Sequence, residues 1–281
     1  MAIELKRSGA PLGHEICGVD IAGGVSDADF AQIETAFNEC GVVVIRDQHL
    51  TPEQHIAFSR RFGDLEKYPV GKFILPGHNE ILVVSNIMED GKPIGLVDAG
   101  RNWHSDMSFV EKPPRCSLLY SLEVPQQDGK AIGDTRFVST SAAWDGLSED
   151  MKQRLAGLKA LNSFRTYSGK KNDGREDDGK GMPDVVHPLV RTHPLTGRMC
   201  LYLSQSVTVK IGDLDDVGTA NLIKDIIAHI TRPEYSYRHN WRVGDLVIWD
   251  NCSSMHKAVF DYALPLRRRM HRTTVMGTRP F

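Results

Sequence analysis

The strand-rich final quarter of the sequence constrains the fold more than any other feature. Short apolar or β-branched runs alternate there with turn residues, and Gly244-Asp245 forms the clearest turn. These runs predict strands at residues 235–241, 246–250 and 269–276. Earlier runs predict strands at residues 42–46, 81–85 and 117–122. Strand runs with helices packed outside them favour a β-sandwich or barrel core.

Two helices are predicted near the start of the chain, each with clear end signals. Ser26 caps the first, which spans residues 27–40 and ends at Gly41. Thr51 caps the second, which begins at Pro52 and ends before Gly63. Apolar residues at helical spacing give the first helix a core-facing side, formed by Phe30, Ile33 and Phe37.

The middle of the chain mixes helices with a hairpin. Residues 149–161 and 217–230 both show helical spacing of apolar residues. The second of these predicted helices brings four residues to one side, namely Ala220, Ile223, Ile227 and Ile230. Residues 189–193 and 199–203 flank Pro194-Leu195-Thr196-Gly197, which predicts a β-hairpin.

Residues 168–184 differ from the rest, because they are polar, charged and rich in glycine and lack apolar periodicity. A solvated surface loop is the simplest interpretation. A lid over a functional site is the alternative, since long loops inside compact domains are often functional. We expect one domain over residues 1–281 with a flexible, lid-like insertion around residues 165–184.

Composition excludes several classes of protein. The 34 basic and 36 acidic residues give a net charge of −2, which offers no electrostatic case for binding nucleic acid or an anionic membrane. Five scattered cysteines contain no Cys-x-x-Cys pair, so we expect neither a disulfide framework nor a thiolate zinc site. The sequence shows no signal-peptide pattern and no apolar run of about 20 residues. We expect a soluble, cytoplasmic protein.

The most informative short motif is His104-Ser105-Asp106. On an extended chain, residues two apart point to the same face, about 7 Å from each other along the strand. His104 and Asp106 would then reach one metal ion together. Two histidines and one carboxylate on one face of an octahedron are the ligand set of iron(II) oxygenases. Taken alone the motif is weak, and a solvated turn with an incidental histidine is the alternative.

A second segment, near the C-terminus, supplies further candidates. Trp249-Asp250-Asn251 ends an apolar strand, and His256 follows five residues later. Arg268 and Arg272 would share one face of an extended strand. An inward-facing arginine pair is costly unless it meets anions, which favours an anion site; a solvated basic edge strand is the alternative.

With both segments in view, the chain resembles the taurine dioxygenase and 2,4-dichlorophenoxyacetate dioxygenase (TauD/TfdA) family over nearly its full length. The order and spacing of many motifs carry the resemblance. They are Gly18-Val19-Asp20-Ile21, Phe62-Gly63-Asp64-Leu65-Glu66, Trp103-His104-Ser105-Asp106-Met107-Ser108-Phe109, Gly133-Asp134-Thr135, His187-Pro188-Leu189-Val190-Arg191-Thr192-His193-Pro194, Gly244-Asp245-Leu246-Val247-Ile248-Trp249-Asp250-Asn251, His256 and Met270-His271-Arg272.

The resemblance implies a fold that is mainly β with outer helices, a double-stranded β-helix (jelly roll, cupin-like). It implies Fe(II) held by His104, Asp106 and His256. It also implies that Arg268 and Thr135 hold the distal carboxylate of the co-substrate 2-oxoglutarate. The implied reaction uses O2 to hydroxylate a substrate while 2-oxoglutarate is decarboxylated to succinate and CO2, and ascorbate helps such assays in vitro.

The resemblance points to a small anionic substrate, with Arg272 near its acid group. Tyr68, Tyr167 and Val207 match other positions of the family's substrate pocket. Several neutral polar partners for a sulfonate are missing, so an aryloxyalkanoate or another carboxylate competes equally with a sulfonate. His193 and His271 are not expected to bind the metal. His271 should point away from Arg268 and Arg272 by strand alternation, which favours a structural role.

Two other functions remain open from the sequence. A protein of the same fold that binds a metal and an acid without catalysis would act as a sensor or carrier. A jelly roll with another metal would support isomerase or hydrolase chemistry. Family resemblance also suggests a homo-oligomer, either a dimer or a tetramer.

Overall fold

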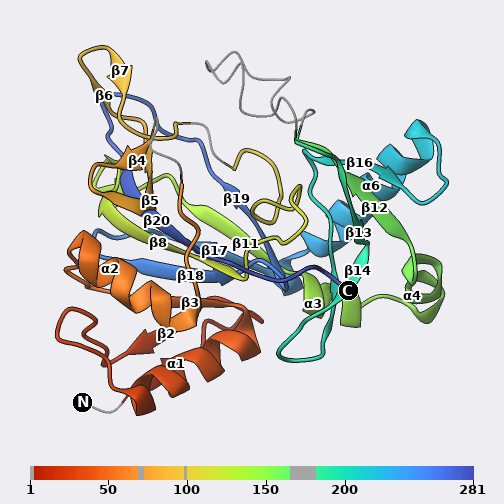
Figure 1. The fold of residues 1–281 in the computed structure, drawn as a ribbon, viewed down its shortest axis with the longest axis horizontal. Helices are drawn as coiled ribbons and strands as arrows, with labels where there is room; N and C mark the ends of the chain where they lie inside the picture. Colours follow the sequence, from red (N-terminus) through yellow and green to blue (C-terminus); the bar gives the residue numbers. More distant parts are fainter. Residues whose placement is uncertain (1–2, 69–72, 98–99, 165–181) are drawn as a thin grey trace.

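The computed structural model describes residues 3–68, 73–97, 100–164 and 182–281, and its largest element is an eight-stranded sheet (Figure 1). All neighbouring strands in it are antiparallel except the parallel pair β2 and β3. In spatial order it contains β1 (Glu4–Lys6), β2 (His14–Cys17), β3 (Val42–Ile45), β18 (Leu246–Asp250), β8 (Cys116–Glu123), β20 (Arg269–Val275), β5 (His78–Ser85) and β4 (Ile74–Leu75).

A three-stranded sheet packs against the inner face of this large sheet. Its strands, in spatial order, are β17 (Ser236–His239), β11 (Thr135–Ser139) and β19 (Ser254–Ala258). One buried cluster contains Phe137 from β11 together with Val44 and Trp249 from the large sheet. The two sheets therefore face each other across an apolar layer, and alternate side chains of β19 and β20 point into the interior of this sandwich.

Strand β3 shows why a continuous apolar run forms part of this sheet. Val42 and Val44 face the inner cluster, whereas Val43 and Ile45 face a second cluster on the outer side of the sheet. Side chains alternate across a strand, so a strand buried on both faces is apolar at every position.

Helices cover the outer face of the large sheet. α1 (Asp27–Cys40) and α2 (Pro52–Ser59), continued by the 3₁₀ turn η1 (Arg60–Phe62), pack there through Phe30, Ile33 and Phe37 among others. Ser26 caps α1, Gly41 ends it with a φ of 74°, and Thr51 forms a capping box on α2. The predicted starts of both helices and the predicted end of the first are confirmed.

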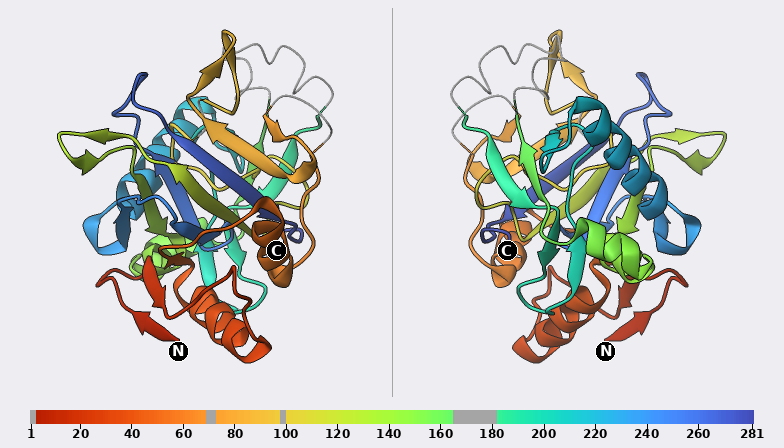
Figure 2. Two further views of the ribbon diagram at one scale, coloured as in Figure 1. Left: turned by 90° about the vertical axis from the view of Figure 1, so that its left-hand side faces the viewer. Right: turned by 90° about the vertical axis from the view of Figure 1, so that its right-hand side faces the viewer.

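A second group of elements lies on the opposite side of the sandwich from α1 (Figures 1 and 2). Its helices are α3 (Thr140–Asp145), α4 (Glu149–Leu155), α6 (Asp216–Ile230) and the 3₁₀ turn η2 (Pro233–Tyr235). Its strands are β12 (Lys159–Asn162), β13 (Val185–Pro188), β14 (Val190–Thr192), β15 (Met199–Leu201) and β16 (Thr208–Ile211). Two small hairpins lie outside these groups: β6 (Met88–Glu89) pairs with β7 (Lys92–Pro93), and β9 (Gln126–Gln127) pairs with β10 (Lys130–Ala131).

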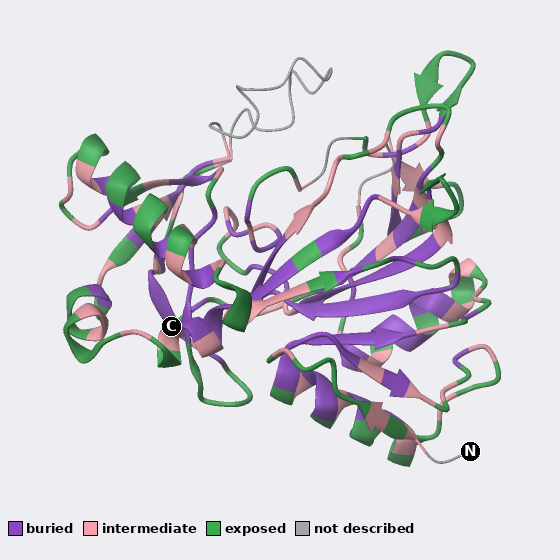
Figure 3. Cartoon of the chain, turned by 180° about the vertical axis from the view of Figure 1, so that it is seen from behind, coloured by how far each residue is buried: buried purple, intermediate pink, exposed green. Residues whose placement is uncertain are grey.

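Burial follows this layering (Figure 3). Strands of the sandwich are mostly buried, while α1 and α6 are buried on one side and exposed on the other. Within the described ranges, no helix has the length and apolar character needed to cross a membrane.

Two predictions of local structure are wrong. The helix predicted over residues 149–161 stops at Leu155, because Gly157 adopts a φ of 76° and residues 159–162 become β12. The buried side of α6 is formed by Thr219, Leu222, Ile226 and Ile230, whereas Ala220 is exposed. The predicted strands and the 189–203 hairpin are present, with ends shifted by up to three residues. Residues 165–181 of the predicted insertion lie outside the described residues.

Candidate metal centre

Two histidines from distant parts of the chain lie directly opposite each other. His104 and His256 form an isolated antiparallel bridge, in which each backbone N–H donates to the other residue's carbonyl, at 3.2 and 2.9 Å. Residues opposite each other in such a pair present their side chains to the same face. The ring centroids of the two imidazoles are 4.1 Å apart.

Asp106 joins the two histidines just after the chain leaves the His104–His256 bridge. It stands at the start of a turn in which Met107 has a φ of 47°. Asp106 Oδ1 lies 3.8 Å from Nε2 of His104 and 3.8 Å from Nε2 of His256. The three side chains predicted to share a metal ion therefore converge, with their ligand atoms within 4.8 Å of one another.

The surroundings of the three groups suit a divalent metal ion. His104 Nδ1 lies 2.8 Å from the carbonyl oxygen of Asn102 and donates its hydrogen there, so Nε2 is the nitrogen that faces Asp106. Burial lowers the pKa of His256 to about 3 and keeps that imidazole neutral. Burial alone would raise the pKa of Asp106, but the Arg272 guanidinium outweighs it and holds the pKa well below its usual range. An ionised carboxylate and a neutral His256 imidazole are the forms that bind a metal.

The spacing also fits a metal with octahedral preferences. Two ligand atoms about 2.1 Å from one ion, at right angles to each other, lie about 3 Å apart. The 3.8 Å gaps from Asp106 Oδ1 to each histidine nitrogen close to that value by small side-chain shifts. Asp106 and His256 are almost fully enclosed, whereas 23% of the His104 side chain is exposed, so the triad is reachable from the His104 side.

Arg268 is a buried cation held by aromatic rings. Its guanidinium carbon lies 5.9 Å from the Trp241 ring centroid and 6.0 Å from that of Tyr262. Burial lowers the pKa of this guanidinium, and the Tyr262 hydroxyl partly offsets the effect. Among the described residues no carboxylate pairs with Arg268, and its Nε atom has no hydrogen-bond partner. A guanidinium enclosed in this way suits a carboxylate ligand.

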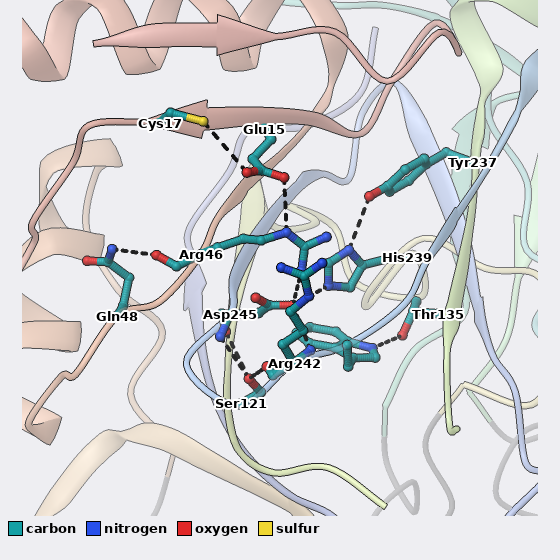
Figure 4. Close-up of polar contacts among 11 residues, drawn as sticks. Glu15, Cys17, Arg46, Gln48, Ser121, Thr135, Tyr237, His239, Arg242 and Asp245 are labelled. Carbon is teal, nitrogen blue, oxygen red and sulfur yellow. Dashed lines mark hydrogen bonds and ion pairs between the residues drawn. The ribbon is translucent and has the colours of Figure 1, made fainter. Parts of the chain in front are cut away.

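Thr135 lies beside the same tryptophan. The Trp241 ring N–H donates to Thr135 Oγ1 at 3.0 Å, which leaves the hydroxyl hydrogen of Thr135 available to a further acceptor. A polar network that includes Arg46, His239 and Asp245 lies beside Thr135 (Figure 4). His239 packs edge-on against Trp241 with ring centroids 4.5 Å apart, and its Nε2 lies 3.0 Å from Asp245, which Arg46 also contacts at 2.8 Å.

The alternation predicted for the last strand is present. Met270 faces the inner cluster and Arg272 reaches Asp106 Oδ1 at 3.2 Å, on the side where Arg268 meets Trp241. His271 points the other way, where burial, with the charge of Arg269, lowers its pKa to about 4. The sequence did not suggest the contact between Arg272 and the metal-site carboxylate.

Two of the three other predicted pocket residues can be placed. Tyr68 lies with its hydroxyl 3.0 Å from Thr274 Oγ1, two residues beyond Arg272 on β20. Val207 is buried in the turn that follows Ser204, and its carbonyl accepts from the backbone N–H of Ser163. Tyr167 lies outside the described residues.

A second group of possible ligands, formed by His193, Asp250 and Cys252, has a structural explanation. His193 Nδ1 accepts from the backbone N–H groups of Leu195 and Thr196, each at 3.1 Å. Its Nε2 then carries the proton and donates to Asp250 Oδ2 at 2.6 Å. Both ring nitrogens are thus used, and this histidine anchors the β14–β15 hairpin to the end of β18.

Two facing sheets that enclose two histidines, one carboxylate and a buried arginine define a class of protein, the jelly-roll proteins with a non-haem iron site. The chain belongs within that class to the TauD/TfdA family: the family model described as "Taurine catabolism dioxygenase TauD, TfdA family" matches residues 4–274.

Known proteins similar to the chain support this membership. Pentalenolactone F synthase of Streptomyces arenae is 35% identical over 95% of the chain and 92% of its own length. The alpha-ketoglutarate-dependent 2,4-dichlorophenoxyacetate dioxygenase of Burkholderia sp. (strain RASC) is 34% identical over 94% of the chain and 91% of its own length. The crystal structure of AAD-2 in complex with Mn(II) and N-oxalylglycine superimposes with a TM-score of 0.81 at 29% identity, covering 100% of the chain and 99% of AAD-2. The predicted family and the predicted mainly β, jelly-roll fold are confirmed.

Proposed function

We propose that the chain is an Fe(II)- and 2-oxoglutarate-dependent dioxygenase that hydroxylates a small organic acid and converts 2-oxoglutarate to succinate and CO2. One observation carries the proposal. The candidate ligands His104, Asp106 and His256 occur in the same sandwich as Arg268, a buried cation without a carboxylate partner among the described residues. A metal site alone would suit several chemistries, whereas a separate carboxylate receptor inside the sandwich suits an acidic co-substrate.

In this proposal each residue has a defined part. His104, Asp106 and His256 hold Fe(II) through Nε2, Oδ1 and Nε2, and when bound the iron supplies the activation of O2 that hydroxylation requires. Arg268 and Thr135 hold the distal carboxylate of 2-oxoglutarate and so orient its oxo-acid end toward the metal. N-oxalylglycine, which AAD-2 binds together with Mn(II), has the same two carboxylates as 2-oxoglutarate.

Arg272 is proposed to receive the acid group of the substrate, because its guanidinium lies at the metal centre rather than at the Arg268 site. Tyr68, Tyr167 and Val207 are proposed to shape the pocket around the rest of the molecule. The relatives of the chain include the 2,4-dichlorophenoxyacetate dioxygenase named above and, at 28% identity, the alpha-ketoglutarate-dependent sulfonate dioxygenase of Saccharomyces cerevisiae. Carboxylates and sulfonates are therefore the substrate classes to compare.

We propose further that residues 1–281 work as one domain in the cytoplasm, as a dimer or tetramer. The five cysteines are free thiols, and four of them are buried, which suits a reducing compartment.

The test is a substrate screen with Fe(II), 2-oxoglutarate and ascorbate, scored by O2 uptake and succinate release. Sulfonates, aryloxyalkanoates and other carboxylates form the panel. The proposal expects at least one acid to couple O2 uptake to succinate release. Metal binding without 2-oxoglutarate turnover across the whole panel would instead favour the non-catalytic sensor.

A further inference from the structure

We propose that Ser117 and Asn251 are positioning residues that fix which oxygen of Asp106 faces the iron. The inference rests on the proposed function, because it takes Asp106 as a metal ligand. It concerns residues that lie behind the carboxylate and touch neither the metal position nor the co-substrate site.

The two carboxylate oxygens of Asp106 have different partners. Oδ2 accepts a hydrogen bond of 2.7 Å from Ser117 Oγ, on β8 of the large sheet. Oδ1 faces Nε2 of both histidines at 3.8 Å and accepts from Arg272 Nη1 at 3.2 Å. Ser117 is fully buried, so water does not compete for its hydroxyl. Asp106 is thereby arranged to bind a metal through Oδ1 alone.

Asn251 sets the direction of the Ser117 hydrogen bond. Its Nδ2 donates to Ser117 Oγ at 3.2 Å, so the serine oxygen acts as acceptor there and must direct its own hydrogen to Asp106. Its Oδ1 accepts from the backbone N–H of Asp106 at 3.1 Å and from the Trp249 ring N–H at 3.2 Å.

The orientation of the Asn251 amide follows from these partners. A flipped amide would place its NH2 group against two N–H donors and leave Ser117 Oγ without a donor. Asn251 is fully buried, so such a mismatch would be costly. The amide therefore holds both the backbone and, through Ser117, the carboxylate of Asp106.

The same short segment also contacts the third ligand. The Trp249 ring packs against the His256 ring with centroids 4.8 Å apart, while its N–H donates to Asn251. The intervening Asp250 points the other way, toward His193. Trp249 and Asn251 thus connect His256 to Asp106 behind the metal position, and this connection is a structural reason for the Trp249-Asp250-Asn251 motif.

Removing the Ser117 hydroxyl should let the Asp106 carboxylate rotate and lose its preference for Oδ1. Hydrogen-bond partners of metal ligands typically change metal affinity about 10–100-fold when mutated. We expect Ser117→Ala to raise the dissociation constant for Co(II), used as the probe metal, by about that factor.

The experiment measures Co(II) binding to the metal-free full-length chain by calorimetry and by the visible absorption of bound Co(II), with the melting temperature recorded for each variant. Ser117→Thr, which keeps the hydroxyl, should retain most of the affinity. Asn251→Ser, whose shorter side chain cannot reach both Asp106 and Ser117, provides a second disruption if Ser117→Ala does not fold. Ser59→Ala is the matched control, because Ser59 is equally buried but bonds to Thr273 and His55 away from the triad.

The expected result is weaker Co(II) binding and an altered absorption spectrum in Ser117→Ala and Asn251→Ser, with wild-type values in Ser59→Ala. Wild-type affinity and spectrum in folded Ser117→Ala would overturn the positioning role. Asp106→Ala separates this outcome from failure of the proposed function: if that variant also binds Co(II) like the wild type, the assignment of Asp106 as a ligand is wrong.

Discussion

Arg272 Nη1 lies 3.2 Å from Asp106 Oδ1, the same carboxylate oxygen that faces the Nε2 atoms of His104 and His256. The guanidinium proposed to receive the substrate therefore contacts the same carboxylate oxygen that is proposed to bind the metal. An acid group that binds Arg272 would lie beside the iron, which brings the nearest C–H bonds of a small substrate within reach of the metal centre.

This relationship predicts a large effect of Arg272→Met on the acid substrate. Hydrogen bonds to charged groups contribute about 1.5–3 kcal/mol, so kcat/KM for the acid should fall about 10- to 150-fold. Steady-state kinetics on the substrate identified by the screen provide the measurement. An uncharged analogue of that substrate should lose much less, and equal losses for both would contradict an anion-binding role.

Arg268 should act on the co-substrate instead. Arg268→Ala removes the proposed buried partner of the distal carboxylate, so the KM for 2-oxoglutarate should rise about 10- to 150-fold. The adjacent Arg267 gives a matched control, because its side chain is 54% exposed and pairs with Glu123 at the surface. Arg267→Ala should leave this KM nearly unchanged; a similar increase in both variants would argue against a specific site at Arg268.

Thr135→Val tests the second contact with the same carboxylate. The change removes the hydroxyl donor and leaves the Trp241 ring N–H without its acceptor. Thr135 gives the carboxylate a single hydrogen bond from a neutral hydroxyl, at the lower end of the range of about 1.5–3 kcal/mol, so the KM for 2-oxoglutarate should rise only about 10-fold. Titration of 2-oxoglutarate at saturating substrate measures it, and an effect as large as that of Arg268→Ala would contradict this ranking.

Stability should fall as the pH drops below about 6.5. Burial, with the charge of His271, lowers the pKa of His55 to about 3, and burial, with the charge of Arg269, lowers that of His271 to about 4. Both groups are neutral when folded but protonate near pH 6.5 when unfolded. The unfolded state therefore binds more protons between pH 6.5 and about 4, and each group costs up to about 1.4 kcal/mol per pH unit there.

Urea unfolding of the metal-free protein at several pH values checks this prediction. His55→Gln should be less stable than the wild type at pH 7 but lose less stability as the pH falls. Parallel pH profiles for the two proteins would show that His55 does not contribute to the acid sensitivity.

Local features of the fold were predictable from neighbouring residues. Ser26 and Gly41 mark the ends of α1, and the apolar run of β3 reflects its burial on both faces. The prediction failed where one residue overrides the periodic pattern, as Gly157 does after α4. It also failed for the buried side of α6, because the neighbouring elements decide which of two adjacent apolar stripes is covered.

The convergence of His104, Asp106 and His256 was predictable because short motifs carry the first two, and family resemblance supplied their partner across the chain. The supporting residues were not, because they come together only in three dimensions. Ser117 and Asn251 are separated by 134 positions, and Arg272 and Asp106 by 166. No local spacing relates such pairs, so their contacts depend on the packing of β8, β18 and β20.

The most direct test of the central claim compares wild-type protein with Asp106→Ala for succinate formation from 2-oxoglutarate in the presence of Fe(II), O2 and an active substrate. Circular dichroism confirms that the variant is folded. If His104, Asp106 and His256 hold the iron, the wild type forms succinate in step with hydroxylated product and the variant forms neither. Undiminished turnover by folded Asp106→Ala would contradict the proposed metal centre.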